Sequence, residues 1–393
     1  MIEIDAGNGP HPLGMSPKKF LAEYWQKKPL LIRNAFPGFV SPVQPEDLAG
    51  LACEDGVLAR LIEHDRANDG WRVRHGPFAE NDFPGMPDHD WTLLVQDMDK
   101  WDADIRALLA SFSFLPRWRI DDIMISFAAT GGSVGAHVDQ YDVFLLQAQG
   151  KRRWQIDAGK HPPLGFRDDV ELKLLREFTP SHDWVLEPGD MLYLPPGVPH
   201  NGVAVDACLT FSLGMRAPSA AELLGDFVDT LAADAPEELR FGDADLTPAK
   251  DTNEIDAAAM ARVVEALNLL RMNDADKLGD WFGSFITTYR SAVEPAAGEA
   301  QRPRIEIEWD LAHGAALQRH PWSRMAWRKA AKGARLYVGG RMLALPVRDA
   351  QRLAAAEAVD GALYDGLSQA GRDAVFELLD AGHYRLSLPD EDE

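Results

Sequence analysis

The sequence contains few cysteines, fewer basic than acidic residues, and no long apolar run. Its two cysteines, Cys53 and Cys208, lie far apart without a C-x-x-C motif, which excludes a disulfide scaffold or a structural zinc cluster and suits a reducing compartment. No stretch approaches the roughly 18 apolar residues of a membrane span. The N-terminus, MIEIDAGNGPHPLG, lacks the basic and then apolar pattern of a signal peptide. We therefore expect a cytoplasmic protein without a membrane segment.

The charge balance is strongly acidic, with 62 acidic against 40 basic residues and a net charge of −22. Such a field repels nucleic acid and attracts basic partners, although solubility alone can also explain it. Direct nucleic-acid binding is therefore not expected. The stretch RMAWRKAAKGAR (324–335) is locally basic and is the exception.

A chain of 393 residues is longer than one compact core usually needs, so we expect two or three domains. Ser16 and Pro17 predict the start of a helix, and PLLIRNAF and WRVRHGPF predict strands. Between about residues 120 and 216, short apolar runs alternate with turn signals. These runs are DDIMISFAA, VFLLQAQ, RRWQI, VLEPGDMLYLPPGVPH and CLTFSLGMR. Many short strands with glycine and proline turns predict a β-barrel or sandwich.

The strand pattern stops at Arg216 and gives way to helical spacing. Ser219 and Glu222 form a capping box that predicts a helix. A second helix is expected around 256–271. Its apolar stripe consists of Met260, Val263, Val264, Leu267 and Leu270. Such stripes are most simply core, but an exposed part could be a dimer surface.

The last hundred residues predict a separate mixed unit. EPAAGEAQRPR (294–304) has the composition of a linker, and RLYVGGRMLAL predicts a hairpin turned at Gly339-Gly340. DAQRLAAAEAV and GRDAVFELLDAG predict helices, HYRLSLP predicts a final strand, and DEDE a solvated tail. This combination suits a winged-helix-like domain.

GAHVDQYD (135–142) carries the main chemical signal. Residues i and i+2 of a strand point to the same face, so His137 and Asp139 would project together. A third ligand is needed, and His200 is the candidate, because the prolines and glycine of YLPPGVPH fix a rigid turn at a strand end. Two histidines and one carboxylate form the facial triad of non-haem Fe(II) oxygenases and leave coordination positions open. We therefore expect one Fe(II) per subunit.

The H-x-D signal can be weighed within the chain itself. Of the eleven histidines, only His137 is followed two residues later by Asp or Glu. Taken alone, His137 could equally lie on a solvated strand surface. Its position after a glycine turn, with PPG-x-P-H downstream in an all-β segment, favours metal binding.

Open positions on the metal require occupants, namely O2 and a cosubstrate such as 2-oxoglutarate. The distal carboxylate of 2-oxoglutarate needs a cation, and KRRW (151–154) follows an apolar strand directly. If Arg152, Trp154 and Ile156 share the inward face, Arg152 is a buried cation with a fork of donors. Ser126 could add a hydroxyl donor. The alternatives are a solvated basic patch and a plain strand serine.

Three stretches, YWQKKPLLIRNAF, GAHVDQYDVFLLQAQGKRRW and LYLPPGVPHNG, resemble the JmjC-domain Fe(II)/2-oxoglutarate oxygenases. More narrowly, they resemble the bacterial ribosomal oxygenases, which hydroxylate an arginine of large-ribosomal-subunit protein sixteen at its β-carbon. The resemblance covers nearly the whole chain and implies an α+β fold. Its parts would be a double-stranded β-helix (a jelly-roll, cupin-like JmjC barrel) in residues 1–218 with its core at about 93–218, a helical dimerisation segment at 219–293, and a winged-helix-like domain at 294–393.

The resemblance also implies roles for individual residues. The iron ligands fall on His137, Asp139 and His200, and the 2-oxoglutarate contacts fall on Arg152 and Ser126. A carboxylate can pair with the guanidinium of a substrate arginine, and an aromatic ring can stack on its plane. The residues that match the family's substrate positions are Asp122, Met124, Tyr141 and Ser212. The family also implies a homodimer and a basic ribosomal protein as substrate.

Three other classes of function remain open at this point. The chain could be an oxygenase of the same fold that hydroxylates histidine or demethylates lysine. It could also be a cupin-like binding protein or regulator without catalysis, or a zinc or manganese enzyme of non-oxidative type. The sequence does not identify the target residue.

Overall fold

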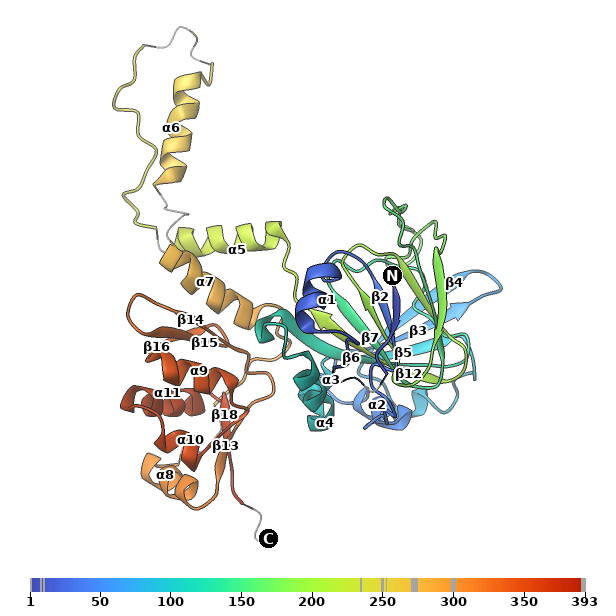
Figure 1. Ribbon diagram of the computed structural model, residues 1–393. Helices are drawn as coiled ribbons and strands as arrows, with labels where there is room; N and C mark the ends of the chain where they lie inside the picture. Colours follow the sequence, from blue (N-terminus) through green and yellow to red (C-terminus); the bar gives the residue numbers. More distant parts are fainter. Residues whose placement is uncertain are drawn as a thin grey trace. The chain divides into compact units, whose positions relative to one another are not determined.

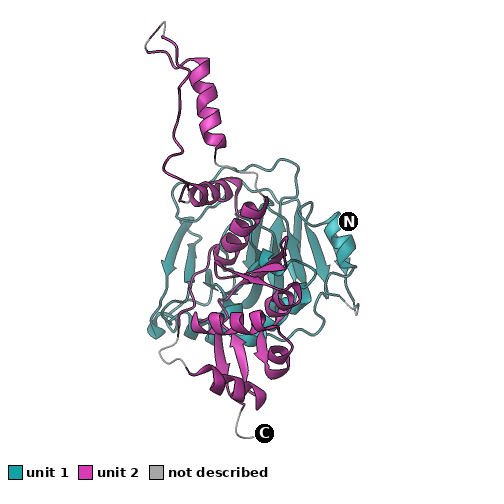
Figure 2. Ribbon diagram, turned by 90° about the vertical axis from the view of Figure 1, so that its left-hand side faces the viewer, with its two compact units in different colours: residues 1–217 teal, residues 218–393 magenta. Residues whose placement is uncertain are grey.

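The computed structural model describes residues 2–7, 9, 11–233, 235–248, 251, 253–269, 275–297 and 302–389. The chain forms two compact units, residues 1–217 and residues 218–393 (Figures 1 and 2). Among the described residues, no helix combines the length and the apolarity needed to cross a bilayer. The predicted acidic tail, DEDE, lies outside the described residues.

Two β-sheets form the first unit. The larger has nine strands in the order β1-β2-β10-β7-β12-β6-β5-β3-β4, and the smaller has the order β11-β8-β9. Their bounds are β1 (Glu3–Asp5), β2 (Leu30–Arg33), β3 (Ala59–Asp65), β4 (Gly70–His75), β5 (Trp91–Val95), β6 (Ile120–Ala128), β7 (Val143–Gln149), β8 (Arg152–Ile156), β9 (His182–Leu186), β10 (Met191–Leu194), β11 (His200–Ala204) and β12 (Cys208–Met215). All strand pairs are antiparallel except β1 with β2.

Short helices accompany these sheets. They are α1 (Pro17–Glu23), α2 (Pro45–Leu51), α3 (Met98–Trp101) and α4 (Ala103–Ala107), with 3-10 turns at Glu80–Asp82, Leu108–Phe112 and Arg117–Arg119. Ser16 caps α1 by accepting a hydrogen bond from the Lys19 N–H, and Pro17 is its first residue, as predicted. The predicted strand PLLIRNAF corresponds to β2, and WRVRHGPF begins with most of β4.

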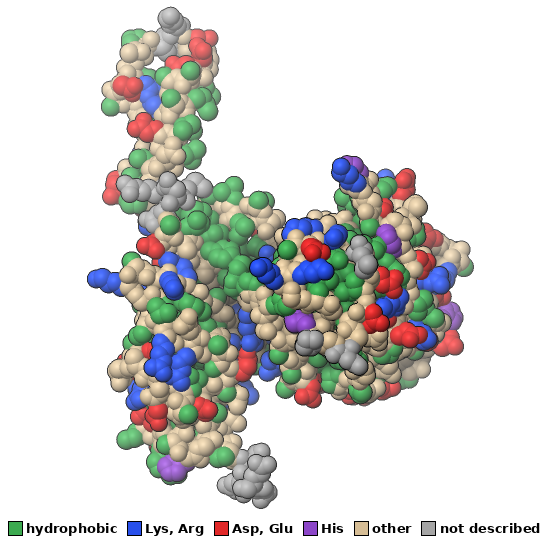
Figure 3. Space-filling model, in the orientation of Figure 1, with side chains coloured by type: hydrophobic (Ala, Val, Ile, Leu, Met, Phe, Trp, Pro, Cys, Tyr) green, Lys and Arg blue, Asp and Glu red, His purple; other side chains and the backbone are tan. Residues whose placement is uncertain are grey.

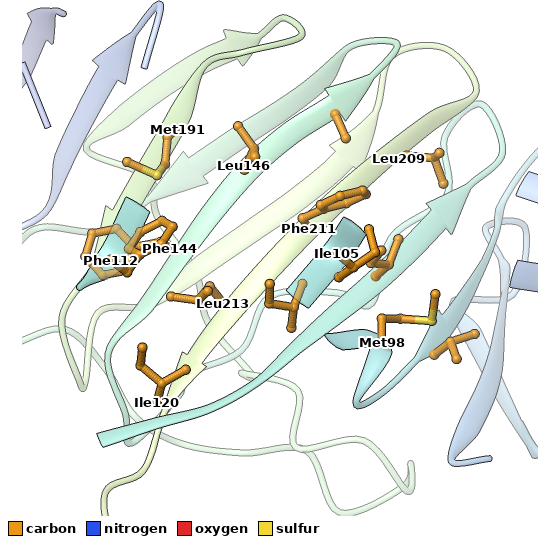
Figure 4. Close-up of a cluster of buried hydrophobic side chains, with 14 of the residues drawn as sticks. Met98, Ile105, Phe112, Ile120, Phe144, Leu146, Met191, Leu209, Phe211 and Leu213 are labelled. Atoms are coloured by element: carbon orange, nitrogen blue, oxygen red, sulfur yellow. The ribbon is translucent and has the colours of Figure 1, made fainter. Parts of the chain in front are cut away.

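Side chains alternate along the central strands, so that one face of the large sheet packs in a hydrophobic core and the other face lines the barrel interior. On β12, Leu209, Phe211 and Leu213 enter the largest hydrophobic cluster, which also contains Met98 of α3 and Ile105 of α4 (Figure 4). Fully burying a side chain of this size contributes about 1.5–3 kcal/mol. The alternate residues of the same strand therefore point to the other face of the sheet.

The other face of the large sheet meets the small sheet across an apolar interior. Val143 and Leu145 of β7 and Leu192 and Leu194 of β10 belong to one cluster with Trp154 of β8. The barrel predicted for this region is thus a pair of facing sheets. The polar residues described below lie on the same interior face.

The second unit begins with three helices, α5 (Ala220–Ala233), α6 (Ala257–Asn268) and α7 (Ala275–Thr288). The predicted capping box at α5 is present, because Ser219 and Glu222 exchange side-chain to backbone hydrogen bonds of 2.7 and 3.1 Å. Phe227 of α5 packs on Trp281 of α7 with ring centroids 4.8 Å apart.

The apolar stripe of α6 is not core, which corrects the simpler of our two expectations. No residue of α6 is buried, and Leu267 is 66% exposed. Hydrophobic side chains accordingly show on the surface of α6 (Figure 3). Leu270, the last residue of the predicted stripe, lies outside the described residues. A helix that is amphipathic but buries nothing leaves its apolar face without a partner among the described residues.

The C-terminal part of the second unit has its own core, built from two three-stranded sheets and four helices. The sheets have the orders β17-β13-β18 and β14-β15-β16. The elements are α8 (Arg304–Ala312), β13 (Ala316–Arg319), β14 (Met325–Lys329), β15 (Ala334–Val338), β16 (Arg341–Leu345), α9 (Val347–Ala355), β17 (Ala358–Asp360), α10 (Gly361–Asp365), α11 (Gln369–Asp380) and β18 (Tyr384–Ser387).

Several predictions for this part are confirmed and one is too long. The hairpin turns at Gly339-Gly340, where both residues have positive φ, and α11 and β18 fall where expected. The helix predicted from DAQRLAAAEAV ends at Ala355. Residues 358–360 instead pair with β13 as β17, because sheet pairing outweighs the local helix propensity of alanine. Residues 298–301 of the predicted linker are outside the described residues, and its last residue, Arg304, already belongs to α8.

Candidate metal centre

Three side chains converge at one point of the barrel. His137, Asp139 and His200 each offer a ligand atom, and these atoms lie within 4.8 Å of one another. His137 Nε2 is 3.9 Å and His200 Nε2 is 3.6 Å from Asp139 Oδ2. The structure therefore brings together residues that are 63 positions apart in the chain, with both imidazoles facing the same carboxylate.

Backbone carbonyls fix both imidazole rings. His137 Nδ1 lies 2.9 Å from the Gly135 carbonyl, and His200 Nδ1 lies 2.9 Å from the Val198 carbonyl. In the neutral ring, a proton donated from Nδ1 leaves the Nε2 lone pair toward Asp139. Burial, and next the neighbouring His137, lowers the pKa of His200 to about 4, so this ring is uncharged at neutral pH. Two imidazoles and one carboxylate fit a divalent transition metal.

The local geometry differs from the strand that we predicted for His137 and Asp139. Only His137 forms a β-bridge, and its partner is His200; Asp139 lies in a loop. Mutual backbone hydrogen bonds of 3.0 Å join His137 to His200, and the Gly197 N–H donates to the Asp139 carbonyl at 2.8 Å. The two ligands therefore share a face because the PPGVPH turn holds the loop, not because of strand periodicity.

Further contacts hold both ends of the ligand loop. The Leu175 N–H donates to the Ala136 carbonyl at 2.8 Å. At the other end, Asp142 is fully buried and accepts hydrogen bonds from Tyr193 Oη at 2.7 Å and from Gln26 Nε2 at 2.9 Å. No specific sequence signal pointed to Asp142, because its anchors lie 51 and 116 residues away.

Arg152 is a buried cation inside the barrel. It is 2% exposed, and β8 buries Arg152, Trp154 and Ile156 while it exposes Arg153, the alternation that we predicted. Its Nη1 donates to Ser126 Oγ at 3.2 Å and to Thr210 Oγ1 at 3.5 Å, and its Nη2 donates to the Gly202 carbonyl at 3.2 Å. Its Nε has no partner within the described residues.

No carboxylate of the described residues forms an ion pair with Arg152, and burial lowers the pKa of its guanidinium. A buried charge without a counter-ion is costly unless a ligand supplies one. The residues present therefore fit a carboxylate ligand. Trp154 lies between the two parts of the site: the Arg152 Cζ is 5.0 Å from its ring and the His200 ring centroid is 5.9 Å away.

Gly202 makes this arrangement possible. A Cβ at this position would lie 2.7 Å from the Trp154 ring and 2.8 Å from Arg152 Nε. No local sequence signal identifies Gly202, Thr210 and Gln147, since only the pairing of β11 with β8 and of β12 with β6 and β7 brings them to Arg152.

Of the four remaining predicted residues, Asp122, Met124 and Ser212 lie on the interior side of β6 and β12, and Tyr141 lies in the loop before β7 and is 37% exposed. β6 and β12 pair Met124 with Ser212 and Ser126 with Thr210. Next to them, a Cβ at Gly214 would lie 3.5 Å from Asp122 Oδ1 and 3.9 Å from Tyr141 Cε2. Asp122 and Tyr141 therefore both lie next to Gly214, and Met124 and Ser212 follow one step along the strands.

Asp122 forms no ion pair with a cation of the described residues. Asp121 pairs with Arg216 at 3.1 Å, and Asp99 forms a buried ion pair with Lys100. Asp122 Oδ2 accepts only the Asp97 N–H at 3.0 Å. Burial, together with the charges of Asp97 and Asp121, raises the pKa of Asp122 to about 7. A guanidinium supplied from outside would relieve this cost.

Comparisons with known proteins agree with this geometry. A JmjC domain model matches residues 107–223, and a ROXA-like winged-helix model matches residues 270–385. The chain is 38% identical over 305 residues to the ribosomal protein uL16 3-hydroxylase of Escherichia coli, covering 76% of this chain and 79% of that protein. It is 36% identical over 286 residues to a probable ribosomal oxygenase of Haemophilus influenzae, covering 72% and 69%.

A solved structure extends the likeness over nearly the whole chain. The ribosomal oxygenase YcfD of Escherichia coli, in complex with cobalt and 2-oxoglutarate, superimposes with a TM-score of 0.81 at 32% sequence identity. The match covers 95% of this chain and 98% of that one.

Proposed function

This chain belongs to the JmjC-domain ribosomal oxygenases, and on that premise we propose that it is an Fe(II)- and 2-oxoglutarate-dependent dioxygenase. Its proposed reaction adds a hydroxyl group to the β-carbon, position 3, of an arginine in large-ribosomal-subunit protein sixteen. One observation carries the proposal: a face of two imidazoles and one carboxylate shares the barrel interior with a buried arginine that has no counter-ion.

We assign the iron to His137, Asp139 and His200, one ion per subunit. Bound iron would supply the activation of O2, and oxidation of 2-oxoglutarate to succinate and CO2 would supply the two electrons that hydroxylation also requires. Arg152 would hold the distal carboxylate of 2-oxoglutarate through charge-assisted hydrogen bonds, and the Ser126 hydroxyl would donate a further one. The apolar cluster around Trp154 would keep water away from the reacting atoms.

We assign the substrate arginine to the position next to Gly214, between Asp122 and Tyr141. The Asp122 carboxylate would accept hydrogen bonds from the guanidinium, and the Tyr141 ring would stack on its plane. Met124 would contact the aliphatic stem, and the Ser212 hydroxyl would lie beside it. This arrangement fixes the side chain at both its charged end and its stem, which is what selection of one carbon atom requires.

The charge of the chain fits a basic protein substrate. With a net charge of −22, the enzyme would attract a ribosomal protein and repel nucleic acid, so we propose no direct nucleic-acid contact. A cytoplasmic location follows from this choice of substrate. We also propose a division into a catalytic part (1–218), a helical dimerisation segment (219–293) and a winged-helix-like part (294–393).

A homodimer would cover the apolar face of the helical segment. Leu224 of α5 and Met260, Val264 and Leu267 of α6 are exposed, and a second copy would present the same stripe. Sedimentation of the wild-type chain and of Leu267→Glu would test this. We expect the wild type to be a dimer and the variant to have a larger dimer dissociation constant. A monomeric wild type would contradict the assignment.

The decisive experiment is an anaerobic incubation with Fe(II), 2-oxoglutarate and a ribosomal-protein extract, followed by air and peptide mass mapping. We expect +16 Da on an arginine of large-ribosomal-subunit protein sixteen, together with succinate release. Modification of a histidine, or loss of methyl groups from lysine, would point instead to another oxygenase of the same fold. Turnover without succinate, or none with any substrate, would contradict the proposed function.

A further inference from the structure

Behind Arg152 lies a second layer of buried polar side chains. Thr210 of β12 and Gln147 of β7 are 1% and 0% exposed. The Thr210 hydroxyl donates to Gln147 Oε1 at 3.1 Å and accepts from Arg152 Nη1 at 3.5 Å. A continuous chain of hydrogen bonds therefore runs from Gln147 through Thr210 to Arg152.

The direction of these hydrogen bonds is fixed at Gln147. The Gln147 amide nitrogen donates to the backbone carbonyls of Gln149 at 2.9 Å and of Gly150 at 3.3 Å. Both carbonyls can only accept, so the amide oxygen has to face Thr210. The Thr210 hydroxyl therefore donates its one proton to that oxygen, and its lone pairs remain available to accept a hydrogen bond from Arg152.

We infer that Gln147 and Thr210 are positioning residues for cosubstrate binding, an inference that rests on the proposed role of Arg152. Arg152 has five N–H donors, and no carboxylate of the described chain orients them. The oriented acceptor at Thr210 holds Nη1 in place before the ligand arrives, so that less side-chain freedom is lost on binding. The neutral amide at position 147 is essential, because a carboxylate there would be an internal counter-ion for Arg152.

Three substitutions separate these contributions. Thr210→Val keeps the shape of the side chain and removes the hydroxyl, whereas Thr210→Ser keeps the hydroxyl. Gln147→Glu adds a negative charge next to Thr210, where it would compete with the carboxylate of the ligand. Because the site is buried, Gln147→Glu could fail to fold, and the Thr210 pair then decides the question.

Thr92 of β5 provides a matched control. It is fully buried, and it is paired with Ala128 of β6. It lies on the same face as Ser126, because Ser126 and Ala128 are two residues apart on β6. Its hydroxyl has no hydrogen-bond partner among the described residues. Thr92→Val is the same chemical change at the same depth, but it removes no hydrogen bond to an arginine among the described residues.

The test measures binding of 2-oxoglutarate to the full-length chain loaded with Mn(II), by isothermal titration calorimetry, and Mn(II) affinity by electron paramagnetic resonance. We expect Thr210→Val to weaken 2-oxoglutarate binding about tenfold, as the loss of one hydrogen bond to a charged group predicts. Thr210→Ser should restore most of it, and Gln147→Glu should weaken it by roughly a hundredfold. Mn(II) affinity and the behaviour of Thr92→Val should match the wild type.

Equal 2-oxoglutarate affinity in Thr210→Val and the wild type would overturn the inference. So would a parallel loss of Mn(II) affinity, because it would show a general effect on the barrel. A wild-type chain that binds no 2-oxoglutarate would instead overturn the proposed function together with this inference. A wild type that binds, with variants that do not differ from it, would overturn the positioning role alone.

Discussion

Arg152 in the barrel and Arg319 in the C-terminal part of the second unit are both buried, at 2% and 8% exposure. Arg319 Nη2 donates to the carbonyls of Leu353 and Ala354 at 3.0 Å each and to that of Ala356. These carbonyls lie at the C-terminal end of α9, where the helix leaves acceptors unpaired and its dipole favours a cation. Arg152 has only two hydroxyls and one carbonyl at 3.2–3.5 Å.

Asp280 and Asp122 show the same contrast between a charge with an internal partner and a charge without one. Burial acts to raise the pKa of Asp280 on α7, but hydrogen bonds from Tyr337 and Arg328, at 2.7 and 2.6 Å, outweigh it and the pKa is lowered. Asp122 in the barrel has no such cation, and its pKa is raised to about 7. The second unit satisfies its buried charges internally. Among the described residues, the barrel leaves Arg152 and Asp122 without a partner of opposite charge, in addition to the Asp139 carboxylate of the metal centre, and this difference distinguishes structural from functional charge in this chain.

The largest effect should come from the metal centre, where a lost side chain should affect chemistry rather than folding. Asp139→Ala removes the only charged ligand. We expect turnover to fall by a factor on the order of 10³ or more, with the melting temperature of the metal-free chain unchanged. Succinate release and differential scanning calorimetry measure the two quantities. Asp183→Ala, an exposed carboxylate on β9, is the control and should retain full turnover.

The contrast between the two arginines can be tested by measuring both ligand binding and stability in an alanine variant of each. Arg152→Ala should weaken 2-oxoglutarate binding by roughly a hundredfold or more. It should leave the free energy of unfolding within about 1 kcal/mol of the wild type, because it also removes a buried uncompensated charge. Calorimetric titration and urea unfolding would measure both. A large loss of stability would place Arg152 with the structural charges.

Arg319→Ala should give the opposite pattern. Leaving three buried carbonyls without donors should reduce the free energy of unfolding by about 3 kcal/mol. The affinity of the barrel for 2-oxoglutarate should not change, and the same two measurements apply. Weakened cosubstrate binding in this variant would break the distinction between the two units.

The smallest effect concerns Asp122 and pH. Its carboxylate form binds a guanidinium, so with a pKa of about 7 the KM for an arginine peptide should rise about tenfold from pH 8 to pH 6. Asp122→Asn should raise KM and remove its dependence on pH.

The same carboxyl group should affect stability. Because its folded pKa lies above the unfolded value, the protonated form favours folding, and this contribution is lost as pH rises through 7. Asp122→Asn should therefore be more stable than the wild type at pH 8. A KM that is flat with pH in the wild type would contradict this assignment.

Local sequence signals succeeded where they depended on neighbouring residues. The cap at Ser16, the capping box at Ser219 and Glu222, the Gly339-Gly340 hairpin and the inward alternation of β8 were all predictable. They failed where tertiary pairing intervened. Residues 358–360 joined a sheet in spite of helical composition, and the α6 stripe stayed exposed because no described element covers it.

The candidate site divides in the same way. The ligand types, and the choice of His200 beside the H-x-D motif, could be read from residue chemistry and rigid turns. The loop geometry of Asp139, the anchor at Asp142 and the layer of Gln147 and Thr210 could not, because each depends on a strand register between distant segments.

By itself, the sequence determined which groups could bind a metal and a carboxylate, because donor chemistry and alternation are local properties of the chain. Only the tertiary structure decided which charges remained unpaired. Whether a buried arginine or aspartate finds an internal partner depends on the segments that pack against it, and those segments lie tens of residues away.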